Sequence, residues 1–172
     1  MKNKNYTSIG EDLATGMNSV FEKMKLPLRV SLCREGAQLP EYKTAGAAGA
    51  DICAALNEPV TLKPLERKLI PTGLKIELCK GYEAQIRPRS GLSIKHGITL
   101  VNCVGTIDED YRGEICVPMI NLSSEDYTIN PGERIAQMII ARVEQVNIIQ
   151  TSESELSATE RGEGGFGSTG VN

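Results

Sequence analysis

The sequence predicts an all-β fold, a barrel or a sandwich built from short strands. Two segments, LRVSL (28–32) and GLKIEL (73–78), alternate apolar and polar residues as half-buried strands do. RGEICVPMINL (112–122) and ERIAQMIIARV (133–143) are further strand candidates. Turn-forming glycine and proline residues separate these segments, which is the pattern expected of an all-β domain.

A helix is predicted ahead of the strands, over residues 8–25. Apolar side chains recur there at helical spacing, at Ile9, Leu13, Met17, Val20, Phe21 and Met24. Ser8 and Glu11 form an S-x-x-E capping box that would begin the helix. We expect this helix to be an accessory element that packs on its own protein.

Glycine and proline are expected in turns or at strand ends, because proline has no N–H for a sheet and glycine suits turn conformations. In the β region they stand at Pro64, Pro71, Gly73, Gly81, Pro88, Gly91, Gly97, Gly105, Gly113, Pro131 and Gly132. The final segment, 151–172, is instead rich in Ser, Thr, Glu and Gly, and it cannot bury enough apolar surface to order itself. We therefore expect a helical extension (1–26), a β-barrel domain (27–150) and a flexible glycine-rich tail (151–172).

The composition excludes several classes of protein. A net charge of −3 and a pI near 5.3 argue against direct nucleic-acid binding, which favours a basic surface. No apolar run reaches the roughly 20 residues of a membrane-spanning helix. The five cysteines contain no CxxC pair, which favours reduced thiols in the cytoplasm, or in the nucleus of a eukaryote. His96 is the only histidine, so a catalytic triad lacks support, and a metal is expected on oxygen ligands.

Two segments carry groups suited to phosphate. In RPRSGLSIKHGI (87–98), two arginines precede Ser90 and Gly91, and the alternatives are an anion site and a polar turn with exposed arginines. In the tail, GEGGFG matches G-x-G-x-x-G, but the chain ends too soon after it for a dinucleotide-binding helix. Arg161, Ser168 and Thr169 flank these glycines, so the tail is a candidate lid that orders on an anion.

VGTIDEDYRGEI (104–115) crowds three acids, Asp108, Glu109 and Asp110, beside Tyr111. One interpretation is a solvated turn, since Asp, Glu and Gly are common there. The other is a carboxylate placed for chemistry. Both stay open on this segment alone.

Taken together, five segments in order resemble the motifs of the trimeric deoxyuridine triphosphatases (dUTPases). They are AGADICAA (48–55), RPRSGLSIKHGI (87–98), GTIDEDYRGEI (105–115), ERIAQMII (133–140) and RGEGGFGSTG (161–170). The similarity covers residues 28–170, and Thr106, where the family often has an aliphatic residue, is a small departure. The resemblance implies a β-clip or jelly-roll barrel and a homotrimer with active sites between subunits.

The resemblance also implies a reaction, the hydrolysis of dUTP to dUMP and pyrophosphate, which keeps uracil out of DNA and supplies dUMP for thymidylate synthesis. Asp108 matches the family's general base, which activates the water that attacks the α-phosphorus. Phosphate contacts are implied for Arg89, Ser90, Gly91, Arg134 and Gln137. Mg²⁺ is implied as cofactor, held mainly by the phosphates and water, with Asp51 as a water-mediated contact.

The remaining implied contacts concern the nucleoside and the lid. Asn102 and Gly105 lie in a predicted β-hairpin over residues 97–107 that would hold uracil, and Tyr111 would pack under the deoxyribose and exclude a 2′-hydroxyl. In the tail, Arg161 is implied on the γ-phosphate, Phe166 on the uracil ring, and Gly167, Ser168 and Thr169 beside them.

Two alternatives remain open. One is a dCTP deaminase, or a bifunctional deaminase of the same fold, against which the intact tail motif argues. The other is a catalytically idle binding paralogue, which usually carries a damaged motif, and none is found here.

Overall fold

The computed structural model describes residues 25–165. The predicted helix over residues 8–25 lies outside them apart from Lys25, which is not helical. The strands are β1 (Arg29–Leu32), β2 (Ala50–Cys53), β3 (Val60–Leu62), β4 (Arg67–Glu77), β5 (Tyr82–Pro88), β6 (Ile98–Leu100), β7 (Gly105–Ile107), β8 (Ile115–Asn121), β9 (Tyr127–Ile129) and β10 (Arg134–Arg142). Helix α2 spans Ser90–His96, and a 3₁₀ turn, η1, spans Glu153–Glu155.

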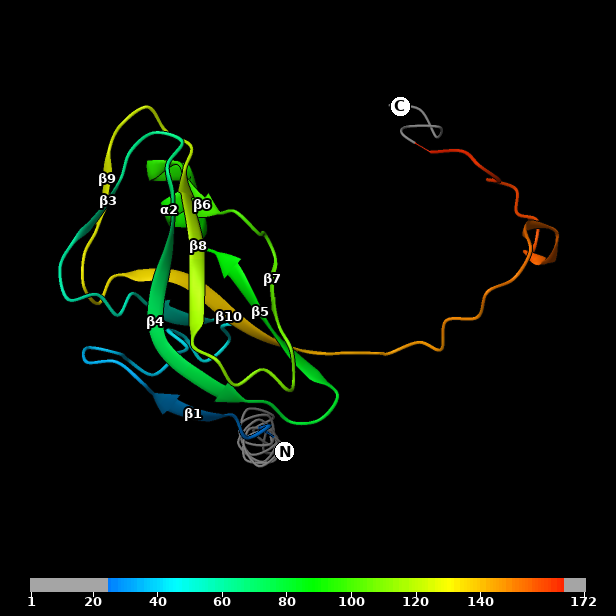
Figure 1. The fold of residues 1–172 in the computed structure, drawn as a ribbon, viewed down its shortest axis with the longest axis horizontal. Coiled ribbons are helices and arrows are strands. Elements are labelled where there is room, and N and C mark those ends of the chain that lie inside the picture. Colours follow the sequence, from blue (N-terminus) through cyan, green and yellow to red (C-terminus); the bar gives the residue numbers. More distant parts are fainter. Residues whose placement is uncertain (1–24, 166–172) are drawn as a thin grey trace, which may run out of the picture.

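The strands form an all-β barrel, as the sequence predicts (Figure 1). One wall is a four-stranded sheet in the order β1-β4-β8-β6, and the other has the order β2-β10-β5-β7. The short strands β3 and β9 pair separately. Every strand pairing is antiparallel.

The core lies between the two walls and follows from alternation along the strands. In β8, Ile115, Val117 and Met119 are buried, while the residues between them are only partly covered. Buried residues of the facing wall, such as Ile52 and Met138, complete the same cluster. Fully burying a side chain of this size stabilises the fold by about 1.5–3 kcal/mol.

Strand β4 differs from the sequence-based expectation. Pro71 and Gly73 were expected in turns or at strand ends, yet both lie inside an eleven-residue strand. A bulge explains this, because the register against β8 shifts between Pro71 and Leu74. Gly73 has φ of 68°, and a Cβ there would lie 2.4 Å from that of Ala37, so glycine is required at the bulge.

Helix α2 was not predicted, although its stop signal is present in the sequence. Lys95 and His96 occupy its last turn, and Gly97 ends it in the left-handed conformation with φ of 65°. Within the helix, the Ser93 hydroxyl donates to the carbonyl of Arg89 at 3.2 Å. At seven residues, α2 is too short for its apolar spacing to be recognised in the sequence.

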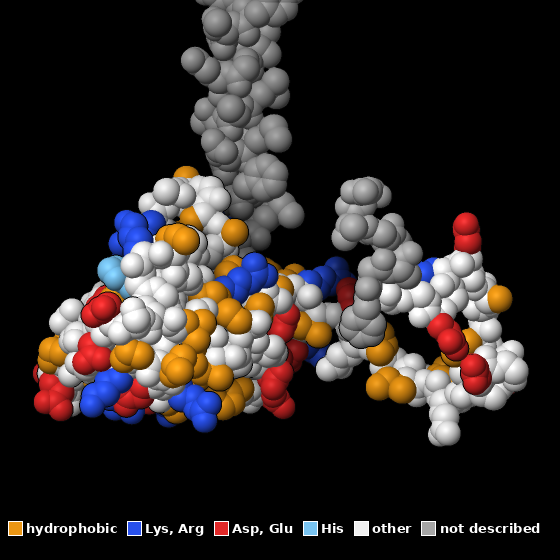
Figure 2. All heavy atoms as spheres, turned by 90° about the horizontal axis from the view of Figure 1, so that it is seen from above, with side chains coloured by type: hydrophobic (Ala, Val, Ile, Leu, Met, Phe, Trp, Pro, Cys, Tyr) orange, Lys and Arg blue, Asp and Glu red, His pale blue; other side chains and the backbone are white. Residues whose placement is uncertain are grey.

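The segment after β10 leaves the barrel (Figure 1). The last strand ends at Arg142, earlier than the predicted domain boundary at residue 150. In the segment that follows, Val146, Ile148 and Ile149 are 78%, 89% and 76% exposed. Figure 2 shows this segment standing apart from the barrel with hydrophobic side chains uncovered.

Asn121 is a buried polar residue at the end of β8 that ties three segments together. Its amide nitrogen donates to the carbonyls of Leu62 at 2.9 Å and Glu125 at 2.7 Å. Its Oδ1 accepts from the Ser123 backbone N–H at 2.9 Å and from the Ser123 hydroxyl at 2.8 Å. The side chain therefore satisfies the buried carbonyl of Leu62 and two partly buried backbone groups of the turn after β8.

Asn121→Ala is expected to destabilise the protein by about 2–3 kcal/mol, because it leaves buried backbone groups unsatisfied. The free energy of unfolding is measured by urea denaturation. Asn57→Ala, in an exposed turn, is the matched control and should change stability by less than about 0.5 kcal/mol. Equal losses in the two variants would show that Asn121 has no special role.

Candidate active site

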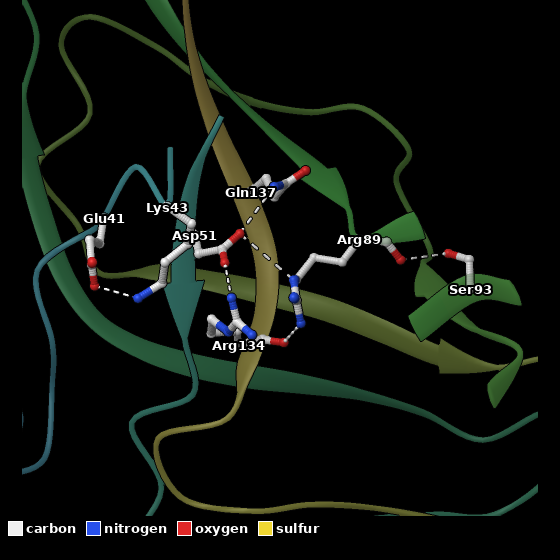
Figure 3. Close-up of polar contacts among 7 residues, drawn as sticks. All are labelled: Glu41, Lys43, Asp51, Arg89, Ser93, Arg134 and Gln137. Carbon is white, nitrogen blue, oxygen red and sulfur yellow. Dashed lines mark hydrogen bonds and ion pairs between the residues drawn. The ribbon is translucent and has the colours of Figure 1, made fainter. Parts of the chain in front are cut away.

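The centre of one polar cluster is Asp51, a carboxylate on β2 that is only 5% exposed. Arg134 Nη1 donates to its Oδ2 at 2.8 Å, and Gln137 Nε2 donates to its Oδ1 at 3.0 Å. Arg89 Nε lies 3.7 Å from Oδ1 as an ion pair. Figure 3 shows the side chains of Arg89, Arg134 and Gln137 converging on Asp51.

The sheet register brings this cluster together. Gln137 on β10 stands opposite Asp51 on β2 and opposite Arg87 on β5. Arg89 follows β5 directly and precedes α2, and its Nη1 donates to the Arg134 carbonyl at 2.8 Å. Two guanidinium groups and an amide thus compensate a buried carboxylate, which would be costly if unpaired.

Ser90 and Gly91 begin α2 next to Arg89, and both are exposed. A Cβ placed on Gly91 would meet no atom within 4 Å, so nothing in the described chain requires glycine there. The surface beside Arg89 is therefore open to a ligand or a partner.

A second network, of a ring contact and hydrogen bonds around Tyr127, packs against α2. The His96 ring lies 5.0 Å from the ring of Tyr127 on β9. The Tyr127 hydroxyl donates to Glu133, whose other carboxylate oxygen accepts the Asn130 N–H at 3.0 Å. Burial, together with the hydrogen bond to Glu133, raises the pKa of Tyr127 above its ordinary value. Glu133 directly precedes Arg134, so this network links α2 to the start of β10.

A polar hollow of about 240 Å³ adjoins Asp51 on the side away from α2, and Glu41, Lys43 and Cys53 line it. Lys43 pairs with Glu41 at 2.5 Å, as Figure 3 shows. Burial raises the pKa of the Cys53 thiol, so this cysteine stays neutral near pH 7 and is a poor nucleophile.

The three crowded acids have different surroundings. The Glu109 carboxylate accepts the Gly81 N–H at 2.7 Å and so fastens the turn to the loop between β4 and β5. Arg112 donates to the Glu109 carbonyl at 2.6 Å. By contrast, the carboxylates of Asp108 and Asp110 form no hydrogen bond or ion pair with the described residues. The turn therefore has one structural acid and two that remain available.

Asp108 lies at the edge of an open cleft of about 700 Å³. The cleft is also lined by Lys80, Tyr82, Glu83 and Thr106. Val143, where the chain leaves the barrel, donates its N–H to the Gly81 carbonyl at 2.9 Å at the side of this cleft. The tail thus departs from the same place as the turn that carries Asp108.

The predicted site residues Asn102 and Tyr111 each pack closely against a glycine. A Cβ at Gly105 would lie 3.2 Å from Asn102 Nδ2, and one at Gly113 would lie 2.3 Å from the Tyr111 hydroxyl. Tyr111 also donates that hydroxyl to the Glu114 carbonyl at 3.0 Å. Each glycine makes room for its neighbour's side chain.

The prediction of a β-hairpin over residues 97–107 is wrong, because the two strands of this segment do not pair with each other. β6 pairs with β8, and β7 pairs with β5, so the loop that contains Asn102 crosses from one wall of the barrel to the other. The reason is that β7 has its hydrogen-bonding partner in β5, not in its neighbour along the chain.

Asp108 and the cluster around Asp51 lie at opposite ends of β5. Ile107 stands opposite Ala84, which places Asp108 beside Glu83 at the start of that strand. Arg89 comes six residues after Glu83, which at about 3.3 Å per residue is roughly 20 Å. A single chain therefore does not bring Asp108 to the cluster around Asp51.

The tail holds the remaining predicted residues. Arg161 is exposed, and its Nε donates to the Gly164 carbonyl at 2.7 Å, so among the described residues its side chain bonds within the tail. Phe166, Gly167, Ser168 and Thr169 lie outside the described residues.

A model of the dUTPase family matches residues 35–170. The chain belongs to the dUTPase family. This confirms the resemblance seen in the five motifs, the fold class that it implied, and the prediction that the chain is an enzyme.

Close relatives of this dUTPase family member are bacterial proteins named deoxyuridine 5′-triphosphate nucleotidohydrolase. The one from Treponema denticola is 59% identical over 152 residues, which is 88% of this chain and 98% of the relative. The one from Fusobacterium nucleatum is 56% identical over 136 residues, covering 79% of this chain and 92% of the relative.

Solved structures agree with the family. The dUTPase of Staphylococcus bacteriophage 80alpha with dUPNHPP has a TM-score of 0.76 at 31% identity, covering 84% of this chain and 99% of that one. A dUTPase from phage phi11 of S. aureus, whose structure reveals coordination of a structural Mg(II) ion, has a TM-score of 0.69 at 26% identity, covering 76% and 99%.

Two further observations concern the part of the chain from residue 25 to 165. It contains no helix of the length and apolarity that a membrane crossing demands. Nor does it contain a group of three or more His, Cys, Asp or Glu side chains placed to hold a metal ion.

Tyr127→Phe is expected to make the protein less sensitive to alkali. An unfolded tyrosine loses its proton near pH 10, whereas folded Tyr127 resists ionisation, so wild-type stability falls as the pH rises above about 10. Urea unfolding from about pH 9 to about pH 11 should show a steeper loss for wild type than for Tyr127→Phe. Tyr42→Phe, at an exposed tyrosine, should behave as wild type, and parallel curves for all three proteins would contradict the expectation.

Proposed function

We propose that the protein hydrolyses dUTP to dUMP and pyrophosphate, with Asp108 as the general base. Membership of the dUTPase family supports the substrate. The observation that carries the role of Asp108 is its carboxylate, which has no partner among the described residues and borders an open cleft. By this reaction the protein keeps uracil out of DNA and supplies dUMP for thymidylate synthesis, in the cytoplasm or in the nucleus of a eukaryote.

In the proposed step, Asp108 orients a water and takes its proton as the water oxygen bonds to the α-phosphorus. The bond from that phosphorus to the bridging oxygen breaks, and pyrophosphate leaves with the electron pair. A carboxylate is a weak base compared with other catalytic bases. Positioning must therefore supply much of the rate, as is typical of phosphoryl transfer.

Positive charge over the leaving group comes from the cluster around Asp51. Arg89 and Arg134 offer guanidinium groups, and Ser90 and Gln137 offer a hydroxyl and an amide. Since Asp51 is buried between these groups, it holds them in place before the phosphates arrive. From the tail, Arg161 binds the γ-phosphate and Phe166 stacks on uracil, with Gly167, Ser168 and Thr169 beside them.

The residues fit a magnesium ion that arrives with the triphosphate. Both oxygens of Asp51 already accept hydrogen bonds, so this carboxylate suits a contact through water rather than direct ligation. Mg²⁺ keeps several waters and is often bound through substrate phosphates. When bound, it neutralises phosphate charge, while the protein orients the substrate.

Selectivity for the nucleoside follows from two contacts. Asn102 and the backbone around Gly105 pair with uracil, and cytosine reverses a donor and an acceptor on that edge. Unpaired buried groups can reject such an analogue by roughly 10⁴-fold or more. Tyr111 forms a wall under the deoxyribose that leaves no room for a 2′-hydroxyl.

We infer a homotrimer with active sites between subunits, as the resemblance to the family implies. Asp108 and Arg89 lie roughly 20 Å apart along β5, and this separation supports a site that a neighbouring chain completes. The exposed Val146, Ile148 and Ile149 after β10 also favour a partner that covers them. The tail then closes a site built by other chains.

Asp108→Asn is expected to lower kcat by at least about 10²-fold, because the amide keeps the size of the side chain but cannot take a proton. A non-hydrolysable dUTP analogue should still bind, as measured by calorimetry. Asp126→Asn, at an exposed acid before β9, is the matched control and should keep full activity. Turnover by Asp108→Asn within a few-fold of wild type would reject Asp108 as the base. In a separate assay of the wild-type protein, ammonia release from dCTP would favour a deaminase.

Activity in mixed trimers tests the assembly. A chain lacking residues 159–172 and a full-length Asp108→Asn chain should each be nearly inactive alone. Refolded together, some trimers pair an intact Asp108 with an intact tail from another chain, so pyrophosphate release should exceed the sum of the parents. If mass spectrometry finds mixed trimers and no activity returns, the tail does not act across subunits.

A further inference from the structure

We propose that Arg34 and Glu114 are positioning residues for sugar selectivity, because together they hold Tyr111 rigid against the deoxyribose. This inference rests on the proposed role of Tyr111 under Proposed function. It adds Arg34, which follows β1 and lies outside the five motifs.

The two side chains form a close ion pair at the side of the β4 bulge. Arg34 Nε donates to Glu114 Oε1 at 2.6 Å, and the Gly73 N–H donates to the same oxygen at 2.9 Å. The side chain of Glu114 is 18% exposed and that of Arg34 is 48% exposed. The hydrogen bond from Arg34, with that from Gly73, lowers the pKa of Glu114, so the carboxylate is ionised throughout the neutral range.

Glu114 is also the residue that holds the Tyr111 ring. The Tyr111 hydroxyl donates to the Glu114 carbonyl at 3.0 Å, and the ring covers Gly113, where a Cβ would come within 2.5 Å of the ring atom Cζ. At its other end, the Tyr111 N–H donates to the Asp108 carbonyl at 3.2 Å. Tyr111 remains 42% exposed, so one side of the ring stays open to a ligand.

Rigidity is the property that sugar selectivity needs. A steric wall rejects a hydroxyl only if it cannot move aside, and Tyr111 is half exposed, so its own packing cannot hold it. With Arg34 absent, Glu114 keeps the Gly73 N–H but loses its ion pair, and the backbone that anchors the tyrosine hydroxyl can shift. Discrimination by size alone is worth about 10–200-fold for one methylene, so a loosened wall should cost about tenfold.

The decisive measurement is the ratio of kcat/KM for UTP to that for dUTP. Arg34→Ala should raise this ratio about tenfold, and Tyr111→Phe, which removes only the hydroxyl anchor, should raise it similarly. Arg29→Ala is the matched control, because Arg29 forms a comparable ion pair with Glu77 at 3.3 Å on the edge of the same sheet. That control should leave the ratio unchanged.

A double variant shows whether Arg34 acts through Tyr111. In a Tyr111→Ala background, where the wall is already gone, Arg34→Ala should raise the ratio no further. An equal increase in both backgrounds would overturn the inference, as would an unchanged ratio in Arg34→Ala when Tyr111→Ala does raise it. If Tyr111→Ala leaves the ratio unchanged, the role of Tyr111 in the proposed function fails first. Arg34→Gln, which keeps most of the stem, replaces Arg34→Ala if thermal unfolding shows that the alanine variant is not folded.

Discussion

The placement of β10 between β2 and β5 is the constraint on which the candidate site depends. Its register sets Gln137 opposite Asp51 on one side and opposite Arg87 on the other. Asp51 can be buried only because this register brings Arg134 and Gln137 to its oxygens, and Arg89 follows from the end of β5. A slip of one residue would turn these side chains into the core and leave a buried carboxylate unpaired.

Two glutamates accept hydrogen bonds from glycine N–H groups, one in a turn and one at the β4 bulge. Glu109 fastens the turn of Asp108 to Gly81, and Glu114 fastens the next stretch to Gly73. Both glycines adopt left-handed conformations, with φ of 80° and 68°, and their N–H groups need partners outside the sheet ladders. The carboxylate of Asp108 has no partner among the described residues, so it is available to accept a hydrogen bond.

The separation of Asp108 from the cluster around Asp51 connects the fold with the proposed assembly. Both groups lie on strands of one sheet, but β5 holds them at opposite ends. The chain after β10 leaves the barrel beside Asp108 and exposes apolar side chains along its length. A partner chain would explain both features, since it could supply the missing half of the site and cover the exposed segment.

The sequence by itself determined the fold class, the strands β1, β8 and β10, and the family, because alternation and motif order are local signals. It could not show that β4 continues through Pro71, that Ser90–His96 is helical, or that β6 and β7 pair with different strands. These depend on hydrogen-bonding partners supplied from elsewhere in the chain. The same holds for the site. Asp51 accepts hydrogen bonds from Arg134 and Gln137, which lie 83 and 86 positions later in the sequence. The Glu109 carboxylate is paired and that of Asp108 is not, because the Gly81 N–H lies beside Glu109. Tertiary structure alone decided that the Glu109 carboxylate is paired and that those of Asp108 and Asp110 remain available.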